Sequence, residues 1–192
     1  MLRRAPTTVR NAIHDRRYGA FLGGSVKTRF GHLGAYNASN TAYEDLPPLF
    51  APADVGPGDV LVDVGVGKGR AINWLLERYP ANRIVGIELD PEIAERTRAR
   101  LRRFENVTIL TGDAVELLPH DGTVFFLFNP FDESVVRRFA AAFLAEGMHP
   151  RRRAIYHNAK HAQVFHDDPR FVVDEIELPS GSFRSMLIRP AG

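Results

Sequence analysis

The sequence predicts an α/β fold with a doubly wound, mostly parallel sheet of seven strands that ends in an antiparallel hairpin. Three observations support this prediction. Apolar runs of strand length alternate with segments of helical spacing from residue 59 onward. A glycine-rich stretch follows the first apolar run, as expected where a strand turns sharply into a helix. The end of the chain changes to two apolar runs joined by a turn rich in proline, glycine and serine.

Length and composition exclude several other classes of protein. The 192 residues correspond to one domain, and 44% hydrophobic with 25% charged residues is typical of a globular chain. The longest apolar run, residues 139–145, is far shorter than the roughly 18 residues of a membrane span, so no membrane partner is expected. The chain has no cysteine, and its histidines follow no metal-binding spacing, so no metal is expected. We expect a cytoplasmic protein whose chemistry depends on oxygen, nitrogen or a bound cofactor.

The first 50 residues differ from the remainder and are predicted to form a segment that covers the substrate. Residues 1–40 carry seven basic side chains and one acidic side chain, Asp15, which gives a net charge of +6. Such a start also resembles a targeting segment or a basic arm for nucleic acid, and both alternatives stay open.

Within this segment the pattern predicts little regular structure. A short helix is expected over residues 7–17. The glycine-rich stretch that follows, residues 19–34, is typical of a mobile cover rather than of a core. Residues 39–50 have helical spacing, which Pro47 and Pro48 are expected to interrupt.

Residues 51–192 are predicted to form the main domain, in which strands and helices alternate. Helices are expected at residues 71–79, from Asp90 onward and at 134–144. Asp90 and Pro91 favour a helix start, because aspartate caps a helix and proline suits its first position. The expected strands are residues 60–62, 84–87, 107–110, 124–128, 154–156, 171–178 and 183–188.

The strongest motif is the sequence Asp-Val-Gly-Val-Gly-Lys-Gly between the first strand and the first helix of this domain. Its glycines, Gly65, Gly67 and Gly69, allow a tight turn and the close approach of a ligand. The spacing G-x-G-x-G differs from the dinucleotide fingerprint G-x-G-x-x-G. Asp63 precedes the first glycine by two residues and suits a cationic ligand, because a carboxylate would repel a pyrophosphate. A purely structural turn is the alternative.

Polar residues also end the next three strands. Glu88 ends the second strand, where a carboxylate can accept hydrogen bonds from both hydroxyls of a ribose. Asp113 follows the third strand, where it can accept from an exocyclic amine, and Asn129 ends the fourth. Each residue alone is consistent with a turn or a helix cap. Together they indicate a nucleotide-like ligand at the carboxyl edge of the sheet.

With these motifs, residues 59–131 resemble a class I S-adenosylmethionine-dependent methyltransferase. The resemblance implies a Rossmann-like sheet with the strand order 3-2-1-4-5-7-6, S-adenosylmethionine as cofactor, and methyl transfer by in-line displacement. The residues that match the family's cofactor site are Asp63, Gly65, Val66, Gly67, Gly69, Glu88, Leu89, Gly112, Asp113, Ala114 and Asn129.

Three residues are candidates for a catalytic role. The loop that begins at Asn129 partly resembles the (Asp/Asn)-Pro-Pro-(Tyr/Phe) loop of amino-methyltransferases, in which the polar side chain accepts from the target nitrogen. His157 ends the fifth strand and is the candidate base for an oxygen nucleophile. Tyr43 matches an upstream element that closes over the cofactor in small methyltransferases, or packs with Leu46 on an apolar helix face. Candidate substrate contacts are Tyr36, Tyr43, Pro130, Phe131, Tyr156 and His157.

The expected methyl acceptor is a small molecule or a protein side chain, at nitrogen or oxygen. One alternative is an RNA methyltransferase that uses the basic N-terminal arm, and another is a non-catalytic module that binds the cofactor. Arg96, Arg100 and Arg103 share one helix face, which is a solvated face or a stripe that tracks RNA. The oligomeric state is not predicted.

Overall fold

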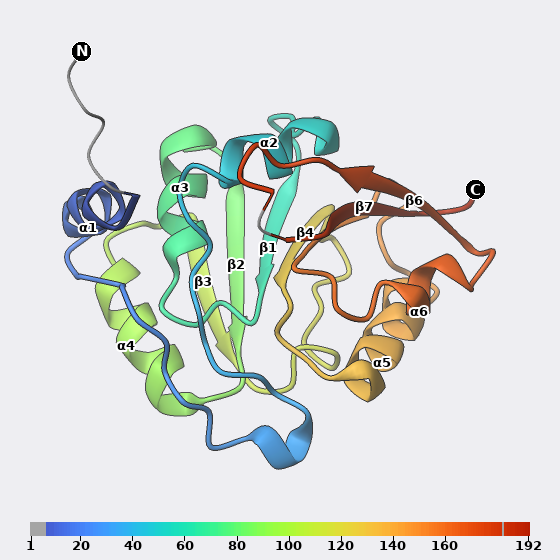
Figure 1. Cartoon of the computed structure of the whole chain (residues 1–192), viewed down its shortest axis with the longest axis horizontal. Helices are drawn as coiled ribbons and strands as arrows, with labels where there is room; N and C mark the ends of the chain where they lie inside the picture. Colours follow the sequence, from blue (N-terminus) through green and yellow to red (C-terminus); the bar gives the residue numbers. More distant parts are fainter. Residues whose placement is uncertain (1–6, 182) are drawn as a thin grey trace.

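A single sheet of seven strands runs through the described part of the chain, in the order β3-β2-β1-β4-β5-β7-β6 (Figure 1). In the computed structural model this part comprises residues 7–181 and 183–192. The start of the basic segment and residue 182 of the predicted hairpin turn therefore lie outside the described residues. The strands are β1 (Val60–Val64), β2 (Arg83–Glu88), β3 (Val107–Thr111), β4 (Val124–Phe128), β5 (Arg153–His157), β6 (Phe171–Ile176) and β7 (Ser185–Pro190).

Strands β1 to β5 are parallel, and β7 pairs antiparallel with both β5 and β6. The predicted fold class and strand order are therefore confirmed. The hairpin strands are shifted from the prediction, because β6 ends at residue 176 and β7 begins at residue 185.

Helices cover both faces of the sheet, which produces two apolar cores. The helices are α1 (Thr7–Arg17), α2 (Leu46–Phe50), α3 (Arg70–Arg78), α4 (Pro91–Leu101), α5 (Glu133–Phe143) and α6 (Gln163–His166), with 3-10 turns η1 (Gly31–Leu33) and η2 (Ala51–Ala53). Along β4, Phe125 and Leu127 pack with α5 and α6, whereas Val124 and Phe126 pack with α2, α3 and α4. This alternation explains why β4 has no polar residue, since each of its faces is buried.

The start of α4 follows the local signals in the sequence. The Asp90 carboxylate accepts hydrogen bonds from the backbone N–H groups of Glu92 (2.9 Å) and Ile93 (3.4 Å), and Pro91 occupies the first helical position. This cap supplies partners for N–H groups that have none within the helix.

The predicted effect of Pro47 and Pro48 on the preceding segment is wrong. Helix α2 begins at Leu46 and contains both prolines in its first turn. Proline is tolerated there because the N–H groups of the first turn have no partner within the helix. The two prolines therefore start a helix instead of interrupting one.

The N-terminal segment follows a long path over the domain. Figure 1 shows α1 beside α3 and α4, and the chain then runs down to the lower edge of the sheet before it returns to α2. At that edge Ala35 forms an isolated antiparallel bridge with Phe131. Among the described residues, no helix has both the length and the apolar character needed to cross a membrane.

Candidate functional site

A cavity of about 370 Å³ lies at the carboxyl edge of the sheet. One wall is formed by the residues that end β1 to β4, and another by residues 32–39 of the N-terminal segment. The volume falls within the usual range of sites for small ligands. The predicted site residues that line this main cavity are Gly65, Glu88, Leu89, Gly112, Asp113, Ala114, Tyr36, Pro130 and Phe131.

Glu88 is held in a fixed orientation at the end of β2. Its Oε2 accepts a hydrogen bond from the Gly67 N–H (2.8 Å), and its Oε1 accepts one from the Asp90 N–H (3.0 Å). Burial raises the pKa of Glu88, and these backbone hydrogen bonds act in the opposite direction. A carboxylate has about four acceptor positions. Glu88 can therefore keep both backbone partners and still accept from two ligand hydroxyls.

Asp63 is a buried carboxyl group at the end of β1. It is 4% exposed, and no described residue donates a hydrogen bond to it. Burial, followed by the charge of Glu88, raises the pKa of Asp63 to about 7. The side chain lines a second, small cavity of about 20 Å³ together with Arg70, Phe128 and residues 39–41. Two neighbouring buried carboxyls without a cation between them favour the binding of a positively charged ligand.

The glycine loop is needed for packing as well as for ligand access. Gly65 has a φ of +77°, and a Cβ atom there would lie 2.7 Å from Cβ of Pro130. Gly69 also has a φ of +77° and precedes α3, where a Cβ would lie 2.8 Å from Nη2 of Arg100. Gly67 and Gly69 line neither cavity. The loop therefore donates a hydrogen bond to Glu88 and packs closely against Pro130 and α4. Only part of it faces a ligand.

Asp113 is already engaged on both oxygens. Its Oδ1 accepts from the Val115 N–H (2.8 Å), and its Oδ2 forms an ion pair with Arg138 (2.8 Å). Residues 113–117 form turns. Asp113 lines the main cavity with Arg138, so a ligand amine would have to share this carboxylate with the guanidinium.

The structure places His157 away from both cavities. The ring is 1% exposed, its Nδ1 lies 2.8 Å from Oγ of Ser185, and it packs against Phe128 and Phe183. Burial lowers the pKa of His157 to about 4, so the ring is neutral at pH 7. Within the described chain, Nε2 has no hydrogen-bond partner.

Tyr43 also lies outside both cavities and belongs to a buried polar network. Its hydroxyl donates to Oδ1 of Asp15 (3.0 Å) and accepts from Nδ2 of Asn73 (3.0 Å). Burial raises the pKa of Tyr43. Asn129 and Tyr156, two further predicted site residues, line neither cavity, and the Tyr156 hydroxyl donates to Oδ1 of Asn129.

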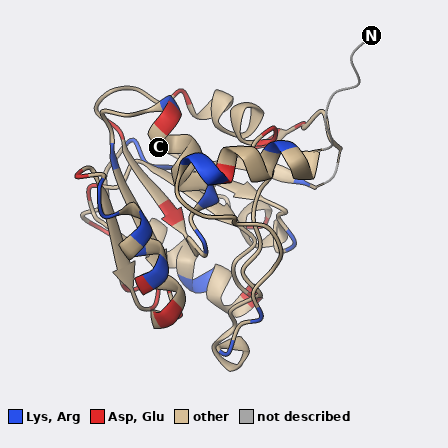
Figure 2. Ribbon diagram, turned by 90° about the vertical axis from the view of Figure 1, so that its left-hand side faces the viewer, with Lys and Arg blue, Asp and Glu red and all other residues tan. Residues whose placement is uncertain are grey.

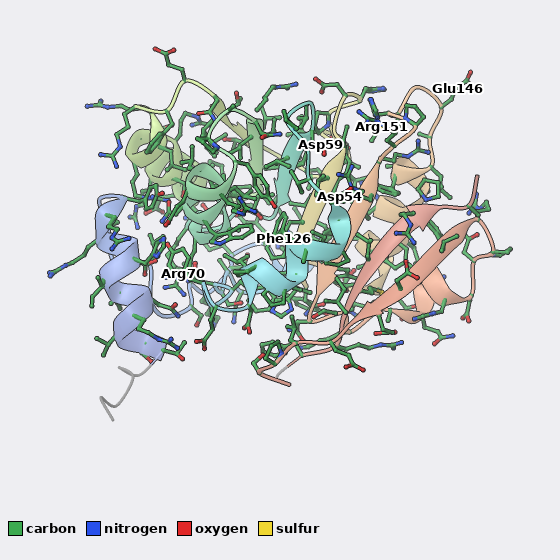
Figure 3. The ribbon with its side chains drawn as sticks, turned by 90° about the horizontal axis from the view of Figure 1, so that it is seen from above. Asp54, Asp59, Arg70, Phe126, Glu146 and Arg151 are labelled. Atoms are coloured by element: carbon green, nitrogen blue, oxygen red, sulfur yellow. The ribbon has the colours of Figure 1, made fainter. Side chains whose placement is uncertain are left out.

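Asp15 is the centre of that network, and sequence patterns did not identify it as a site residue. It is fully buried and accepts from the Leu22 N–H (3.0 Å), from Tyr43 and from two nitrogens of Arg70 (3.0 and 2.7 Å). Arg70 directly follows the glycine loop, and Figure 3 shows it beside α1. The sequence feature that could have drawn attention to Asp15 is that it is the only acidic residue among the first 40.

Lys68 and Arg100 further connect the glycine loop to the N-terminal segment. Nζ of Lys68 donates to the carbonyls of Gly23 (2.6 Å) and Gly24 (2.7 Å). Arg100 donates to the carbonyls of Lys68 (2.8 Å) and Tyr18 (3.2 Å). The cofactor loop and the N-terminal segment therefore share hydrogen-bonding partners.

Two of the three arginines in the predicted stripe, Arg96 and Arg100, are held by other residues of the described chain. Burial lowers the pKa of Arg100, whose side chain points inward as described above, and Arg96 pairs with Glu92. Figure 2 shows acidic residues among the basic ones on α1 and α4. Helical spacing alone could not reveal this, because α1 covers part of the α4 face.

Together, the sheet order and the site define the class of protein. The fold is that of class I S-adenosylmethionine-dependent methyltransferases, and residues 61–148 match the family model of a methyltransferase domain. These residues therefore form a methyltransferase domain, whose class uses S-adenosylmethionine. The predicted family and cofactor are confirmed.

Similar proteins include methyltransferases with different acceptors. The chain is 32% identical over 110 residues to a tRNA (guanine-N(7)-)-methyltransferase of Wolinella succinogenes, covering 53% of this chain and 28% of that protein. It is 31% identical over 72 residues to a probable ribosomal RNA small subunit methyltransferase A of Methanosarcina barkeri, covering 38% and 24%. The matches thus span about a quarter of these relatives.

A solved structure supports the same fold. An RNA methyltransferase from Salinibacter ruber in complex with S-adenosyl-L-homocysteine superposes with a TM-score of 0.63 at 22% identity. The superposition covers 79% of this chain and 93% of that one. At this identity the likeness supports the fold and leaves the acceptor open.

Proposed function

We propose that the protein is an enzyme that transfers a methyl group from S-adenosylmethionine to nitrogen or oxygen of a small molecule or a protein side chain. The observation that carries this proposal is the pair of buried carboxyls, Asp63 and Glu88, at adjacent strand ends beside the glycine loop. A ligand with both a ribose and a positive charge satisfies this pair. The cytoplasmic location expected from the sequence is part of the proposal.

The residues present fit this cofactor. Glu88 would hold the ribose hydroxyls, and Asp63 with Arg70 would face the zwitterionic methionine end, since both line the small cavity. Asp113 would hold the adenine amine. When bound, S-adenosylmethionine supplies a methyl group already activated on a sulfonium. The protein would then contribute mainly orientation and the exclusion of water.

The N-terminal segment would complete the acceptor pocket. The Tyr36 N–H donates to the Pro130 carbonyl (2.9 Å), and the Asp132 N–H donates to the Gly34 carbonyl (2.8 Å). Leu33 and Tyr36 line the main cavity and are exposed, which suits contact with an apolar or aromatic acceptor. The sequence predicts that residues 1–50 form a cover, but α2, which lies within this range, packs in the core. We therefore assign the covering role to residues before α2.

RNA methylation is a second candidate, favoured by one observation. Arg16 and Arg17 at the end of α1, and Arg102 and Arg103 after α4, are exposed and form no ion pair with any described residue. Arg103 donates to the Arg17 carbonyl (3.2 Å), so the two helix ends meet. A salt titration of RNA binding distinguishes the candidates, because phosphate contacts weaken steeply with salt. Turnover to S-adenosylhomocysteine distinguishes an enzyme from a non-catalytic module.

The substitution Glu88→Ala is expected to weaken S-adenosylmethionine binding at least 30-fold, about 2 kcal/mol, because charge-assisted hydrogen bonds to the ribose are lost. Isothermal calorimetry measures this loss, with thermal melting as the check on folding. The matched control is Glu95→Ala, since Glu95 is an exposed acid on α4 whose one ion pair within the described residues is with Arg98. Equal affinity in the two variants would contradict the role of Glu88. Binding of NAD or ATP without S-adenosylmethionine would contradict the proposed function.

Affinity for S-adenosylmethionine is expected to rise with pH up to about 7. Below the raised pKa of Asp63 the free protein carries a proton on this carboxyl, which a cationic ligand must displace. Affinity should thus fall by about tenfold per pH unit below that pKa. The same raised pKa means that ionisation of Asp63 destabilises the free fold as pH rises from 3.8 to about 7.

Calorimetry between pH 5 and 8 measures the dependence of affinity on pH. The isosteric variant Asp63→Asn should flatten the profile, because an amide does not titrate in this range. A wild-type profile as flat as that of the variant would show that Asp63 does not interact with the cation.

A further inference from the structure

The small cavity beside the glycine loop adjoins the main cavity and has both signs of charge at its wall. Its volume of about 20 Å³ is room for one small polar group. Ser39, Gly65 and Phe128 line both cavities, so the small one is a side pocket of the main one. An acid, Asp63, and a base, Arg70, also line the small cavity.

Arg70 is buried but uses only part of its hydrogen-bonding capacity. The residue is 7% exposed, and its Nε and Nη2 atoms donate to the Asp15 carboxylate at 3.0 and 2.7 Å. A guanidinium carries five N–H groups. The other three, two of them on Nη1, have no acceptor among the described residues. Since buried N–H groups without an acceptor are rare, these groups indicate a ligand that accepts hydrogen bonds.

The start of α3 adds further donors at the same place. Gly69 precedes the helix and has no side chain with which to cap it. Arg70 and Ala71, the first two residues of α3, both line the small cavity. Their backbone N–H groups have no partner within the helix, and the helix dipole gives this end a partial positive charge. A carboxylate has the charge and the acceptor atoms that match these donors.

We infer, on the basis of the proposed function, that Arg70 binds the carboxylate of S-adenosylmethionine and that Asp15 is the positioning residue that orients the guanidinium toward it. The ammonium of the same amino-acid end would be bound by Asp63, to which no described residue donates a hydrogen bond. The cofactor site thus depends on α1, although no residue of α1 lines either cavity.

Asp15 fixes the orientation of Arg70 because both of its oxygens bind the guanidinium. Oδ1 accepts from the Tyr43 hydroxyl and from Nε of Arg70, and Oδ2 accepts from the Leu22 N–H and from Nη2 of Arg70. If either oxygen is replaced by an amide NH2 group, that group opposes one nitrogen of Arg70, since both are donors. The variant Asp15→Asn therefore keeps the shape of the side chain but displaces the guanidinium in either orientation of the amide.

The test compares the affinities of S-adenosylmethionine and decarboxylated S-adenosylmethionine, which differ by the carboxylate alone. Calorimetry on wild-type protein is expected to show a preference for the intact cofactor of about 30-fold or more, because the decarboxylated ligand lacks a charge-assisted contact with Arg70. Asp15→Asn should reduce this preference about fivefold or more, because the guanidinium is no longer held in place. A purely structural role of Asp15 would lower both affinities alike and leave the preference unchanged.

Two further variants complete the experiment. The double variant Asp15→Leu with Arg70→Met removes the guanidinium without leaving a buried charge unpaired, and should reduce the preference about tenfold or more even if Asp15→Asn fails to fold. The matched control, Asp59→Asn, alters a second buried ion pair, in which Asp59 binds Arg153 at 2.7 Å. Neither residue of that pair lines the main or the small cavity, so the preference should stay unchanged.

Two results would overturn the inference alone, namely similar affinities of wild-type protein for the two ligands, or an unchanged preference in the double variant. An unchanged preference in a folded Asp15→Asn variant would overturn the positioning role of Asp15. Binding of neither ligand to wild-type protein would overturn the proposed function itself, and this inference with it.

Discussion

Deletion of residues 1–34 is expected to abolish methyl transfer and to leave a folded domain that binds cofactor about tenfold more weakly. The fold should survive because, among the described residues before Tyr43, Leu22 is the only large apolar side chain that is buried. Both apolar cores lie in the remainder of the chain. Activity should be lost because the deletion removes the Gly34 carbonyl, which binds Asp132 at the cavity rim.

The weaker cofactor binding follows from the glycine loop. Lys68 loses the carbonyls of Gly23 and Gly24, and Arg100 loses that of Tyr18, so the loop becomes less rigid. Calorimetry with S-adenosylmethionine and labelled methyl transfer measure the two effects separately. A control that lacks only residues 1–6 keeps α1 and should retain turnover. Full turnover after the longer deletion would reduce the segment to a tail or targeting arm, and an unfolded product would place it in the core.

A single substitution, Asp15→Ala, is expected to destabilise the fold by about 3–5 kcal/mol, the usual effect of removing one partner of a buried ion pair. Arg70 is only 7% exposed, and α1 would still cover it after the substitution. The guanidinium, the Leu22 N–H and the Tyr43 hydroxyl would all lose a partner. For a chain of this size the loss corresponds to a melting temperature lower by roughly 10 °C.

Deletion of residues 1–34 is not expected to cause this loss of stability. Removing α1 exposes Arg70 to water at the same time as it removes Asp15, so the guanidinium is not left buried without a partner. The matched control is therefore the double variant Asp15→Leu with Arg70→Met, which replaces the pair by apolar groups and should recover the part of the stability that Asp15→Ala loses by leaving Arg70 unpaired. Chemical denaturation of the three proteins provides the comparison. A loss below 1 kcal/mol in Asp15→Ala would show that water reaches Arg70 despite α1.

Local signals predicted the features that depend on neighbouring residues. The Asp90 cap, the ends of β1 to β4 and the glycine turn are each specified by a few adjacent residues, so their types and spacing were enough to predict them to within two residues. Proline at positions 47 and 48 was misread because the same residue that interrupts a helix also suits its first turn.

Contacts between distant residues could not be predicted in this way. Asp15 and Arg70 are 55 residues apart, and Tyr156 and Asn129 are 27 apart. No local pattern marks either pair. Similarly, the position of His157 at a strand end suggested an accessible base, whereas contacts with Phe183 and Ser185, which are distant in the sequence, accompany its burial.

The hydrogen bonds from Lys68 and Arg100 to the N-terminal segment have a thermodynamic consequence. If closure of that segment stabilises the glycine loop, closure and cofactor binding are cooperative, and the coupling must be equal in both directions. An acceptor molecule that favours the closed segment thereby acts as a positive effector of cofactor binding, and the cofactor favours retention of the acceptor to the same degree. After the reaction, one opening of the segment would weaken the hold on both products, so their release would be linked to a single conformational step.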